Sequence, residues 1–570
     1  MRCLVSKGLF QLIILLILVS CQTGLNDKIV DLITLDQIGY LAQMAKHAFI
    51  NCDTVFDFEI VQEEKAEVVF KGKIIHSSKL DALSGQRPGL ADFSVLTKPG
   101  KYFLRVNGLG RSVSFVIDDN VYLPVSEAIL KMLYFQRASF ELTKDFAGPW
   151  AHRAGHLDNA KIFSNPELEV EANGGWYDAG DYGRYVVPVT ITIADLYLSF
   201  RVNPSLFSDN LHIPESGNGI PDLLDEVRFA LNWLLKMQDK KSGGVYHKLT
   251  SLNFPRLDLM PAEDKSTQYL APISATATAC FAAICASSAR IWQKWDPDFS
   301  AKLIKAAQTA WRWLKANPAA PPFKNPQGMS TGEYSSPESG DERLWAACEL
   351  AALTGDNEYY EYLRSKGISF LTNSRLRSLF SWEEVLGYAL AAYLDLPKKD
   401  IELSRLITDF LTDHIKLRLQ LAETGYRLPL SIDEISWGSN KNLTDTAKLF
   451  WLAQHYALPF SIKDQLGNII HYLFGANPLG ICYVTGFGTK SVTSPHHRIS
   501  VGDLVLQPVP GMVAGGPNKN LEDDVAKTKL SGRAPLLCYI DDRGSYATNE
   551  VTTYWNASAL FALAYLQSLY

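Results

Sequence analysis

A long series of segments with helical spacing constrains the fold most strongly, and it runs from about Val121 almost to Tyr570. Apolar residues recur three and four positions apart in each segment, the pattern of helices that bury one face. A series of about a dozen helices without a short sequence repeat fits either a solenoid or a closed ring of helical hairpins. Long loops rich in Gly and Pro interrupt the series, and we therefore expect the closed ring. The segments are 124–141, 186–200, 221–238, 274–294, 299–316, 341–354, 382–395, 401–420, 443–457, 461–474 and 556–569.

Two of the interrupting loops, 317–340 and 475–549, are much longer than ordinary connections. Loops of such length usually carry function, because a compact domain otherwise has no use for them. We expect the second loop to contribute to a site.

The residues before the helical series favour short strands. Glu67–Phe70, Lys101–Val106 and Ser112–Ile117 are rich in β-branched and aromatic residues, and Gly, Pro and Asn turns separate them. This pattern predicts a small antiparallel β-sandwich over residues 29–118. It gathers no carboxylates or histidines into a plausible site, and we interpret it as a structural module ahead of a helical domain over 121–570.

The first residues have the pattern of an export signal. Two basic residues precede an apolar run from Leu9 to Val19 that is too short for a comfortable membrane span. The run ends in Leu18-Val-Ser-Cys21, which resembles a bacterial lipobox and implies cleavage before Cys21 and lipidation of its sulfur. Gln22 stands where an Asp is associated with retention in the inner membrane. We expect segment 1–21 to leave the protein lipid-anchored at an outer membrane or cell surface; the alternative is a plain signal peptide with a chance cysteine.

The charge balance excludes one class of partner. The chain has 55 basic and 61 acidic residues and a sequence pI near 6.0. No overall excess of positive charge is available to neutralise phosphate backbones, and we therefore expect no nucleic acid partner.

The stretch Gly174–Tyr185 brings two carboxylates, four aromatics and four glycines into twelve residues at the start of a predicted helix. Asp178 and Asp181 are three positions apart in a turn that glycine allows to bend sharply, so both side chains can reach one small volume and hold a water between them. The alternative is an acidic turn that only caps the following helix.

Further polar residues cluster in the long loop near the C-terminus. Ser494–Ser500 contains two imidazoles and a guanidinium, and Tyr539–Glu550 brings carboxylates to the edge of the last helix. Two carboxyl groups in different environments are what cleavage of a glycosidic bond requires, one protonated to release the leaving oxygen and one ionised to deprotonate water.

These motifs resemble glycoside hydrolase family 9, the cellulase family. The resemblance covers nearly everything after the signal and implies an all-β, immunoglobulin-like N-terminal sandwich followed by a mainly α catalytic domain, an (α/α) six-hairpin toroid. The matching blocks are Asp36-Gln-Ile-Gly-Tyr40, Asp178-Ala-Gly-Asp181, Gly219-Ile-Pro-Asp-Leu-Leu-Asp-Glu226, Pro495-His-His-Arg498 and Asp541 through Glu550 to Asn556-Ala557.

The resemblance also implies a role for each site residue. Asp181 is expected to be the general base that activates water, Asp178 to help hold that water, and Glu550 to be the general acid. His496 and Arg498 match the family's sugar-contacting pair, and Asp541 matches an acidic position in the same signature. For these last residues the alternative is structural, because polar loop residues often only satisfy one another or cap a turn.

Aromatic side chains around the acids are expected to stack on sugar rings. The candidates come from loops and helix starts, and the alternative for each is a place in the core. They are Trp176, Tyr177, Trp382, Trp437 and Tyr546.

Two departures from the family pattern concern metals. Members with this N-terminal module often bind zinc through a Cys-His pair, but Ala154-Gly-His156 lacks the cysteine, and we expect no such zinc. The block Thr331-Gly-Glu-Tyr-Ser-Ser336 through Asp341-Glu342 resembles a structural calcium loop, with Ser336 where an aspartate is common. The loss of one charge weakens a calcium site without abolishing it; the alternative is an acidic helix start without a metal. No cofactor is expected for the chemistry.

The sequence thus predicts an enzyme that hydrolyses β-1,4-glucosidic bonds in cellulose-like, mixed-linkage or xyloglucan β-glucans, as an inverting endoglucanase. The first alternative is an exo-acting relative, a β-glucosidase or glucosaminidase. The second is a surface glycan-binding protein on an inactive scaffold, against which the intact Asp178, Asp181 and Glu550 argue.

Overall fold

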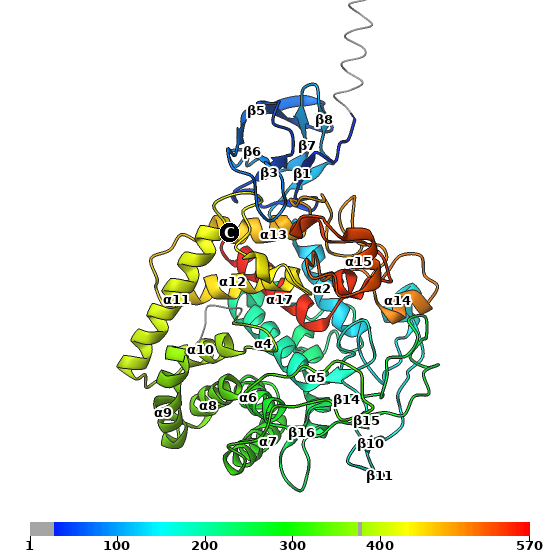
Figure 1. The fold of residues 1–570 in the computed structure, drawn as a ribbon, viewed down its shortest axis with the longest axis vertical. Coiled ribbons are helices and arrows are strands. Elements are labelled where there is room, and N and C mark those ends of the chain that lie inside the picture. The colour runs from blue at the N-terminus through cyan, green and yellow to red at the C-terminus, as the bar shows by residue number, and fades with distance from the viewer. Residues whose placement is uncertain (1–27, 374–378) are drawn as a thin grey trace, which may run out of the picture.

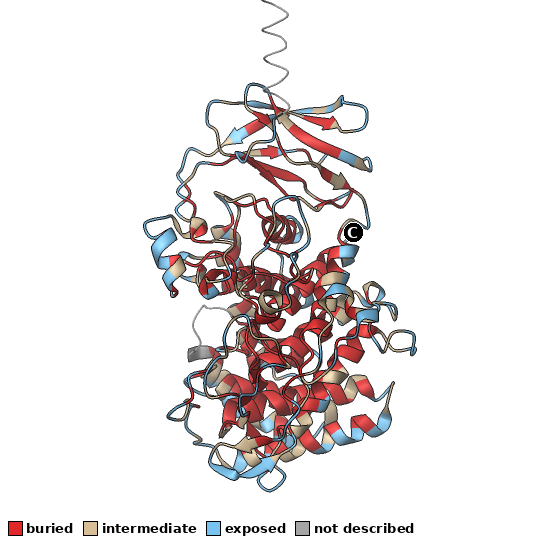
Figure 2. Cartoon of the chain, turned by 90° about the vertical axis from the view of Figure 1, so that its right-hand side faces the viewer, coloured by how far each residue is buried: buried red, intermediate tan, exposed pale blue. Residues whose placement is uncertain are grey.

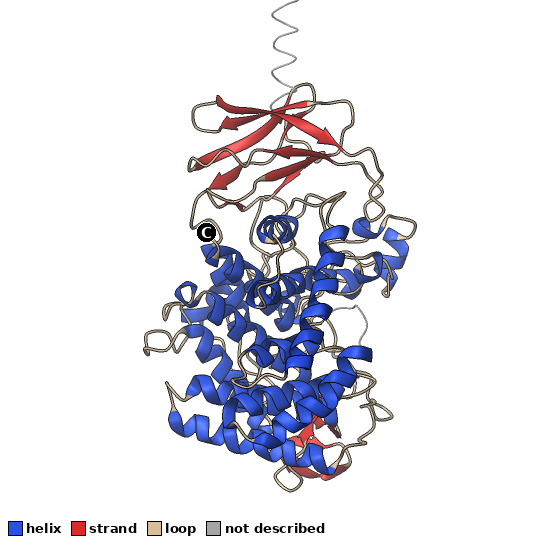
Figure 3. Cartoon of the chain, turned by 90° about the vertical axis from the view of Figure 1, so that its left-hand side faces the viewer, coloured by secondary structure: helices blue, strands red, loops and turns tan. Residues whose placement is uncertain are grey.

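A computed structural model of the chain describes residues 28–373 and 379–570. A β-sandwich lies at one end of a larger helical body (Figure 1). Figure 3 shows the same division by secondary structure, with a few further strands at the end of the body remote from the sandwich. The predicted leader 1–21, with Cys21, lies outside the described residues. In the described part of the chain, no helix has the length and apolar character needed to cross a membrane.

The sandwich is a nine-stranded array with the order β1-β3-β6-β5-β4-β7-β9-β2, and β8 pairs with β7. The ten-residue strand β5 joins the two layers, because it pairs with β4 through 67–73 and with β6 through 74–76. Inward residues such as Ile60, Leu104 and Phe115 are fully buried. The strands are β1 (Ile33–Leu35), β2 (Gly39–Tyr40), β3 (His47–Ile50), β4 (Asp57–Gln62), β5 (Glu67–His76), β6 (Gly89–Asp92), β7 (Gly100–Val106), β8 (Gly110–Arg111) and β9 (Phe115–Ile117).

Six helices form an inner ring. They are buried along nearly their whole length, and Figure 2 shows the buried interior of the helical body. Their apolar residues are therefore not confined to one face, and some of the charged residues that they bury, such as Lys448, are paired with one another. Each contacts the next in the series, and the last packs back against the first, so the ring closes. In ring order they are α4 (Val186–Val202), α6 (Ala275–Trp292), α8 (Gly340–Thr354), α10 (Leu386–Leu394), α12 (Ser439–His455) and α17 (Thr553–Ser568). The preference for a closed ring of hairpins over a solenoid is confirmed.

Six further long helices pack outside the ring, each against an inner neighbour. In α7, for example, Phe299, Leu303, Ala307, Ala310 and Leu314 form the buried face. These outer helices are α2 (Leu123–Phe135), α5 (Asp222–Lys236), α7 (Pro297–Ala316), α9 (Asn357–Asn373), α11 (Ile401–Leu421) and α13 (Lys463–Leu473). Short helices α3 (Lys144–Ala147), α14 (Arg498–Gly502), α15 (Asp524–Leu530) and α16 (Tyr546–Asn549) lie in the loops.

Three sequence expectations need correction. The predicted segment 124–141 stops as a helix at Phe135, and 382–395 becomes helical only at Leu386. Helix α9 was missed, because its apolar positions are largely tyrosines and Gly367 interrupts it.

Small strands at the mouth of the ring were also missed, since most contain only two or three residues. They form a five-stranded sheet, β11-β10-β15-β14-β12, and a pair, β13-β16. In the larger sheet Tyr185 pairs with Lys248. The strands are β10 (Ala160–Ile162), β11 (Asn165–Val170), β12 (Arg184–Tyr185), β13 (Val245–Tyr246), β14 (Lys248–Thr250), β15 (Tyr269–Leu270) and β16 (Ile273–Ser274).

The sandwich is joined to the helical body through Asp36–Tyr40, the first of the sequence blocks that match the family pattern. Asp36 is fully buried, and its Oδ2 accepts a hydrogen bond from the Tyr122 hydroxyl at 2.9 Å and lies 2.9 Å from Nδ1 of His471 on α13. Figure 1 shows α13 directly beneath the strands. This contact fixes the module on the helical domain.

Candidate active site

The turn that carries Asp178 and Asp181 lies where the first and last inner helices meet. The backbone N–H of Asp178 donates to the Gly183 carbonyl at 2.9 Å, which closes the turn, and its carbonyl accepts from Thr553 at the start of α17 at 2.8 Å. Gly180 has no room for a side chain, because a Cβ there would lie 2.0 Å from the His496 carbonyl oxygen. Glycine thus lets the two loops touch backbone to backbone.

The two aspartates have different partners. Asp181 Oδ2 accepts hydrogen bonds from the Gly183 N–H at 3.0 Å and from the Tyr185 hydroxyl at 3.1 Å. Asp178 is fully buried, and its Oδ2 accepts from the Tyr334 hydroxyl at 2.6 Å, while Oδ1 has no partner among the described residues. Burial raises the pKa of Asp178 well above its usual range, and the Asp181 charge adds to this shift, whereas the Tyr334 hydrogen bond opposes it.

Glu550 stands between α16 and α17. Its backbone forms a parallel bridge with His496 and accepts a hydrogen bond from the Gly515 N–H at 2.9 Å. Thr552 caps α17 through its hydroxyl, which accepts from the Trp555 N–H, so the chain turns into the helix directly after the acid. Burial raises the pKa of Glu550 well above its usual range; the Asp181 and Asp178 charges raise it further, and Arg498 opposes them. This environment keeps a proton on Glu550.

His496 lines the same site with a defined tautomer. Its Nδ1 lies 2.7 Å from the Arg543 carbonyl, which can only accept, so Nδ1 carries the proton and Nε2 is free to accept a hydrogen bond. Burial lowers the pKa of His496 below its usual range, and the ring is therefore neutral near neutral pH.

Arg498 and Asp541 hold loops in place. Arg498 donates from Nη1 to the Gly180 carbonyl at 2.7 Å and from Nη2 and Nε to the Pro255 carbonyl at 3.0 and 3.1 Å, although its side chain also lines the pocket. Asp541 accepts from Thr493, twice, and from the Ser494 N–H and the Asn549 amide at 2.7–3.0 Å. These donors occupy its carboxylate away from the pocket. Asp541 is therefore a structural residue of the His496 loop, and its assignment as a catalytic residue is corrected.

Asp181 and Glu550 line one pocket of about 800 Å³ together with His496 and Arg498. Its walls are largely aromatic. The aromatic lining consists of Tyr185, Phe254, Tyr334, Trp382, Trp437, Tyr546, Tyr554 and Trp555.

Three of the five predicted aromatic platforms line this pocket, namely Trp382, Trp437 and Tyr546. Trp437 and Tyr546 are 42% and 36% exposed, and their ring centroids lie 5.2 Å apart. The other two predictions are wrong. Trp176 is 0% exposed and donates from Nε1 to Glu226 at 3.1 Å, and Tyr177 is 1% exposed, with its hydroxyl 2.6 Å from Nδ1 of His156. Neither ring has a face open to a sugar.

Sequence reasoning missed Tyr185 and Tyr334, the two hydroxyls that bond the aspartates. Tyr334 belongs to the block Thr331–Ser336, which was considered only as part of a calcium loop. The sequence does contain a sign of a functional role for Tyr334, because the block places an aromatic residue in an acidic, glycine-containing turn within one of the two long loops. Nothing in the local sequence, however, predicts that this turn lies beside Asp178.

The structure also places the acidic residues of the predicted calcium loop. Asp341 and Glu342 are buried at the start of α8, and Asp341 Oδ2 accepts from the Val385 N–H at 2.7 Å. Both carboxylate oxygens of Glu342 are buried without a hydrogen-bond partner among the described residues. Burial raises the pKa of Glu342 well above its usual range, and the neighbouring Asp341 and Glu384 charges raise it further. Buried acidic oxygens of this kind fit a hard cation such as calcium.

A second group of carboxylates lies at the start of α5. Ligand atoms of Asp209, Asp222 and Asp225 lie within 4.8 Å of one another. Asp222 is fully buried, and its Oδ1 has no partner in the described part of the chain. This group could also hold a cation.

His156, which follows the missing cysteine, is engaged by protein groups. Its Nδ1 lies 2.6 Å from the Tyr177 hydroxyl and its Nε2 lies 3.1 Å from Asp264 Oδ2. Both ring nitrogens therefore have side-chain partners.

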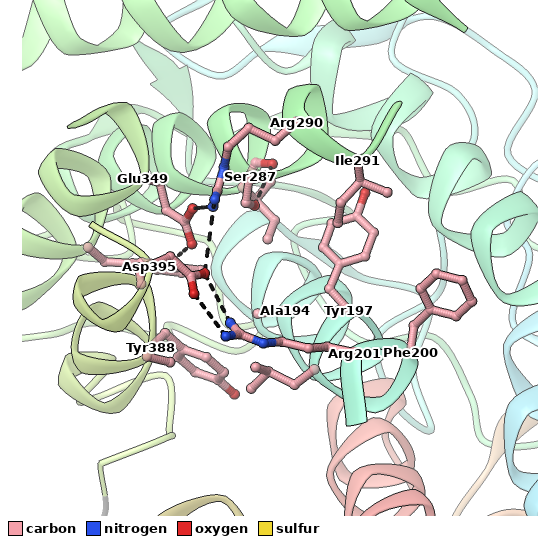
Figure 4. A pocket seen from close by; sticks show the side chains of 15 residues that line it. Ala194, Tyr197, Phe200, Arg201, Ser287, Arg290, Ile291, Glu349, Tyr388 and Asp395 are labelled. Carbon is pink, nitrogen blue, oxygen red and sulfur yellow. Dashed lines mark hydrogen bonds and ion pairs between the residues drawn. The ribbon is translucent and has the colours of Figure 1, made fainter. Parts of the chain in front are cut away.

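A separate cavity of about 340 Å³ lies at the C-terminal half of α4, remote from the turn at its start. Figure 4 shows its charged wall, in which Arg201 pairs with Asp395 at 2.8 Å and Arg290 contacts both Glu349 and Asp395. Because arginines neutralise both acids, this cavity lacks the pair of available carboxyls that the pocket at Asp181 and Glu550 contains.

Comparison with known proteins agrees with this geometry. The sequence model described as "Glycosyl hydrolase family 9" matches residues 122–563, and that described as "Cellulase N-terminal ig-like domain" matches residues 31–111. A xyloglucan-specific endo-beta-1,4-glucanase of Bacteroides ovatus is 35% identical, over 96% of this chain and 95% of that protein. A cellodextrinase of Butyrivibrio fibrisolvens is 33% identical, over 93% of this chain and 99% of that protein.

A solved structure gives the same result. The crystal structure of a single-mutant thermostable endoglucanase from Alicyclobacillus acidocaldarius superposes with a TM-score of 0.88 at 36% identity, over 94% of this chain and all of that one. The family match spans most of the chain and contains every acid of the pocket. The chain therefore belongs to glycosyl hydrolase family 9, with the immunoglobulin-like module preceding its catalytic ring.

Proposed function

We propose that this protein is an endo-acting β-1,4-glucanase that cleaves its substrate by a single displacement with inversion. One observation carries the proposal: a carboxyl that keeps its proton, Glu550, shares an aromatic pocket with Asp181 of the turn. Inverting hydrolysis needs these two kinds of group on opposite sides of one bond.

Each residue has a part in the reaction. Glu550 gives its proton to the leaving oxygen, and Asp181 takes a proton from the attacking water. Asp178 keeps one carboxylate oxygen without a protein partner, which is available to hold that water beside Asp181. His496 accepts from a sugar hydroxyl through Nε2, the nitrogen that its bond to Arg543 leaves unprotonated.

The exposed aromatic surface supports action within a chain. Trp437 and Tyr546 present adjoining rings, and Trp382 lines the same pocket, so more than one sugar ring has an apolar face to stack on. Names of relatives include an endoglucanase specific for xyloglucan and a cellodextrinase. The substrate class for this chain is thus β-1,4-glucan, with cellulose-like, mixed-linkage and xyloglucan chains as the candidates.

The decisive experiment follows early products from a panel of soluble β-glucans and chitosan oligomers. Mixed long oligosaccharides support the endo proposal, single sugars would favour a β-glucosidase or glucosaminidase, and no products at all would favour a glycan-binding protein. Proton NMR of the first-formed anomer tests the displacement, because inversion of a β-linked glucan yields the α-anomer first.

We further propose a lipid anchor at Cys21 that holds the enzyme at an outer membrane or cell surface. The lipobox-like Leu18–Cys21 supports it, and acylation attaches a folded body to a membrane without any spanning helix.

A structural calcium is the third part of the proposal. Asp341 and Glu342 would hold the ion, and its charge would compensate the two buried, unpartnered oxygens of Glu342. The ion would stabilise the start of α8 and take no part in bond cleavage.

A further inference from the structure

Lys248, in strand β14, carries a buried ammonium group next to the catalytic turn. The side chain is 0% exposed, and no carboxylate oxygen in the described part of the chain lies within ion-pair distance of Nζ. Instead Nζ donates to oxygens of the 325–332 loop: Gly332 O at 2.6 Å, Asn325 Oδ1 at 2.7 Å, and the carbonyl and hydroxyl oxygens of Thr331, both at 3.2 Å. Lys248 thus holds a loop and forms no direct ion pair.

Burying the Lys248 ammonium group without a direct ion pair costs folding free energy. Burial lowers the pKa of Lys248 to about 7, and the negative charges of Asp181 and Glu333 act in the opposite direction. Burying an ammonium group costs more than burying an apolar side chain of similar length. A purely structural loop anchor could use a neutral donor, so the charge itself calls for an explanation.

The held loop leads directly to Tyr334. His247, the neighbour of Lys248, lies with Nε2 2.9 Å from the Glu333 carbonyl, so the two side chains contact three consecutive carbonyls, those of Thr331, Gly332 and Glu333. The next residue, Tyr334, has a left-handed backbone with φ of 47°, which a non-glycine residue adopts only when its surroundings impose it. Its hydroxyl donates to Asp178 at 2.6 Å.

A second path runs from Lys248 to the other aspartate. Tyr185, whose hydroxyl donates to Asp181 at 3.1 Å, lies beside the loop that Nζ holds, because a Cβ on Gly332 would lie 3.4 Å from that hydroxyl. Tyr185 is also the strand partner of Lys248, and Nζ lies 5.6 Å from the centre of its ring. One ammonium group is therefore connected to both aspartates through tyrosines.

We propose that Lys248 is a positioning residue of the hydrolytic reaction, whose buried ammonium group fixes the loop 331–334 and orients Tyr334 and Tyr185 toward Asp178 and Asp181. The inference rests on the proposed function and deepens it. Lys248 does not touch the substrate. It acts through the two tyrosines, and its positive charge lies within electrostatic reach of Asp181.

The charge effect is directed at the aspartates. The charged and titratable groups facing Lys248 are Asp181, Glu333, Tyr185 and His247. Glu333 already pairs with Lys324 at 3.0 Å and accepts from the Asn325 N–H at 2.9 Å. Burial lowers the pKa of His247 to about 3, so that ring stays neutral. Loss of the ammonium charge is therefore felt mainly at the catalytic turn.

The test compares Lys248→Met and Lys248→Arg with Lys46→Met. Lys46 is a matched control, because it is also 0% exposed and donates to the carbonyls of Ala42 and Met44 at 2.7 and 2.9 Å, but it lies in the sandwich. The readouts are kcat, KM and the pH dependence of kcat/KM on a soluble β-glucan, together with the unfolding temperature.

For Lys248→Met we expect kcat to fall about 10–100-fold with a smaller change in KM, as misplaced catalytic groups do. The acid limb of the kcat/KM pH profile, where activity falls as the pH is lowered, should move to higher pH by roughly half a unit or more, because a cation that favours ionised carboxylates has been removed. Lys248→Arg should restore the limb in part. Lys46→Met should lower the unfolding temperature and leave the limb where it is. Tyr334→Phe combined with Lys248→Met should cost less than the sum of the two single changes.

An unshifted acid limb in folded Lys248→Met, or strict additivity with Tyr334→Phe, would overturn the inference. If Lys248→Met does not fold, Thr331→Val carries the test, since it removes the hydroxyl to which Nζ donates at 3.2 Å. A limb shifted in the same direction supports the inference, and an unshifted limb refutes it. An inactive wild-type protein would instead contradict the proposed function, so the two failures are distinguishable.

Discussion

Truncation of Trp437 and of Trp176 should have opposite consequences. Trp176→Ala removes a side chain that is 0% exposed, which typically costs about 3–5 kcal/mol of unfolding free energy. It also takes the Nε1 donor away from buried Glu226, at about 1–3 kcal/mol. A loss of about 4–8 kcal/mol is a large part of the stability of an ordinary domain, about 5–15 kcal/mol. We therefore expect a steep fall in the unfolding temperature.

Trp437→Ala acts on binding instead, because 42% of the side chain is already exposed. An indole face that covers one sugar ring removes on the order of 60–80 Å² of apolar surface from water, or about 1.5–2 kcal/mol. This corresponds to a more than tenfold weaker complex. Stability should change little.

The assay pairs thermal unfolding with calorimetric titration of a long cello-oligosaccharide into the Glu550→Gln background, in which hydrolysis of the bound substrate is slow. Tyr546→Ala should resemble Trp437→Ala, since the two rings adjoin. If Trp437→Ala binds as tightly as the background protein, and Trp176→Ala binds more weakly with normal stability, then Trp176, not Trp437, is the ring on which the sugar stacks.

Four further predictions follow from the buried charges and the leader. Glu550→Gln should slow hydrolysis of natural glucans about 10²–10⁴-fold but largely spare aryl glycosides whose leaving group needs no proton, and equal losses on both would refute its role as acid. The pKa of Asp178 is raised in the folded state, so its carboxyl contributes its full stability to the fold below the unfolded pKa of about 3.9, and this contribution is lost as the pH rises through the folded pKa. Asp178→Asn should therefore unfold at a higher temperature than wild type at pH 7, and the difference should vanish near pH 4. Calcium should raise the unfolding temperature of chelator-treated wild type and not that of Glu342→Gln, and an equal response would place the ion elsewhere, with the Asp222 cluster as the next candidate. Cys21→Ala should release the protein from membranes while the purified soluble form keeps its activity, so that continued membrane association would contradict the anchor.

Periodicity was enough to predict most of the helices, and the long Gly- and Pro-rich loops between them favoured a closed ring over a solenoid. The acids could be named because motifs place them in short, recognisable turns. What could not be predicted is which neighbours those turns acquire. Trp176 and Trp437 have the same side chain next to similar turns, and only the closed ring decides that one is core and the other is exposed.

The roles of Tyr334 and Asp541 were unpredictable for a related reason. Tyr334 reaches Asp178 across 156 positions of sequence, and three of the four hydrogen bonds that Asp541 accepts come from Thr493 and Ser494, 47 or 48 positions away. Partners at such separations cannot be predicted from the local spacing of residues. A motif therefore identifies a carboxylate but does not show whether it faces the substrate or holds a loop.

The backbone contact between Gly180 and the His496–Arg498 loop also has a kinetic consequence. Arg498 grips the Gly180 carbonyl across 318 residues, and the loop-closure entropy of so long a connection must be overcome before the acids meet. Contacts of this range form late in folding, after local helices. During refolding from denaturant, hydrolytic activity should therefore return after most of the helical signal, and a stalled intermediate with nearly native helix content should be inactive.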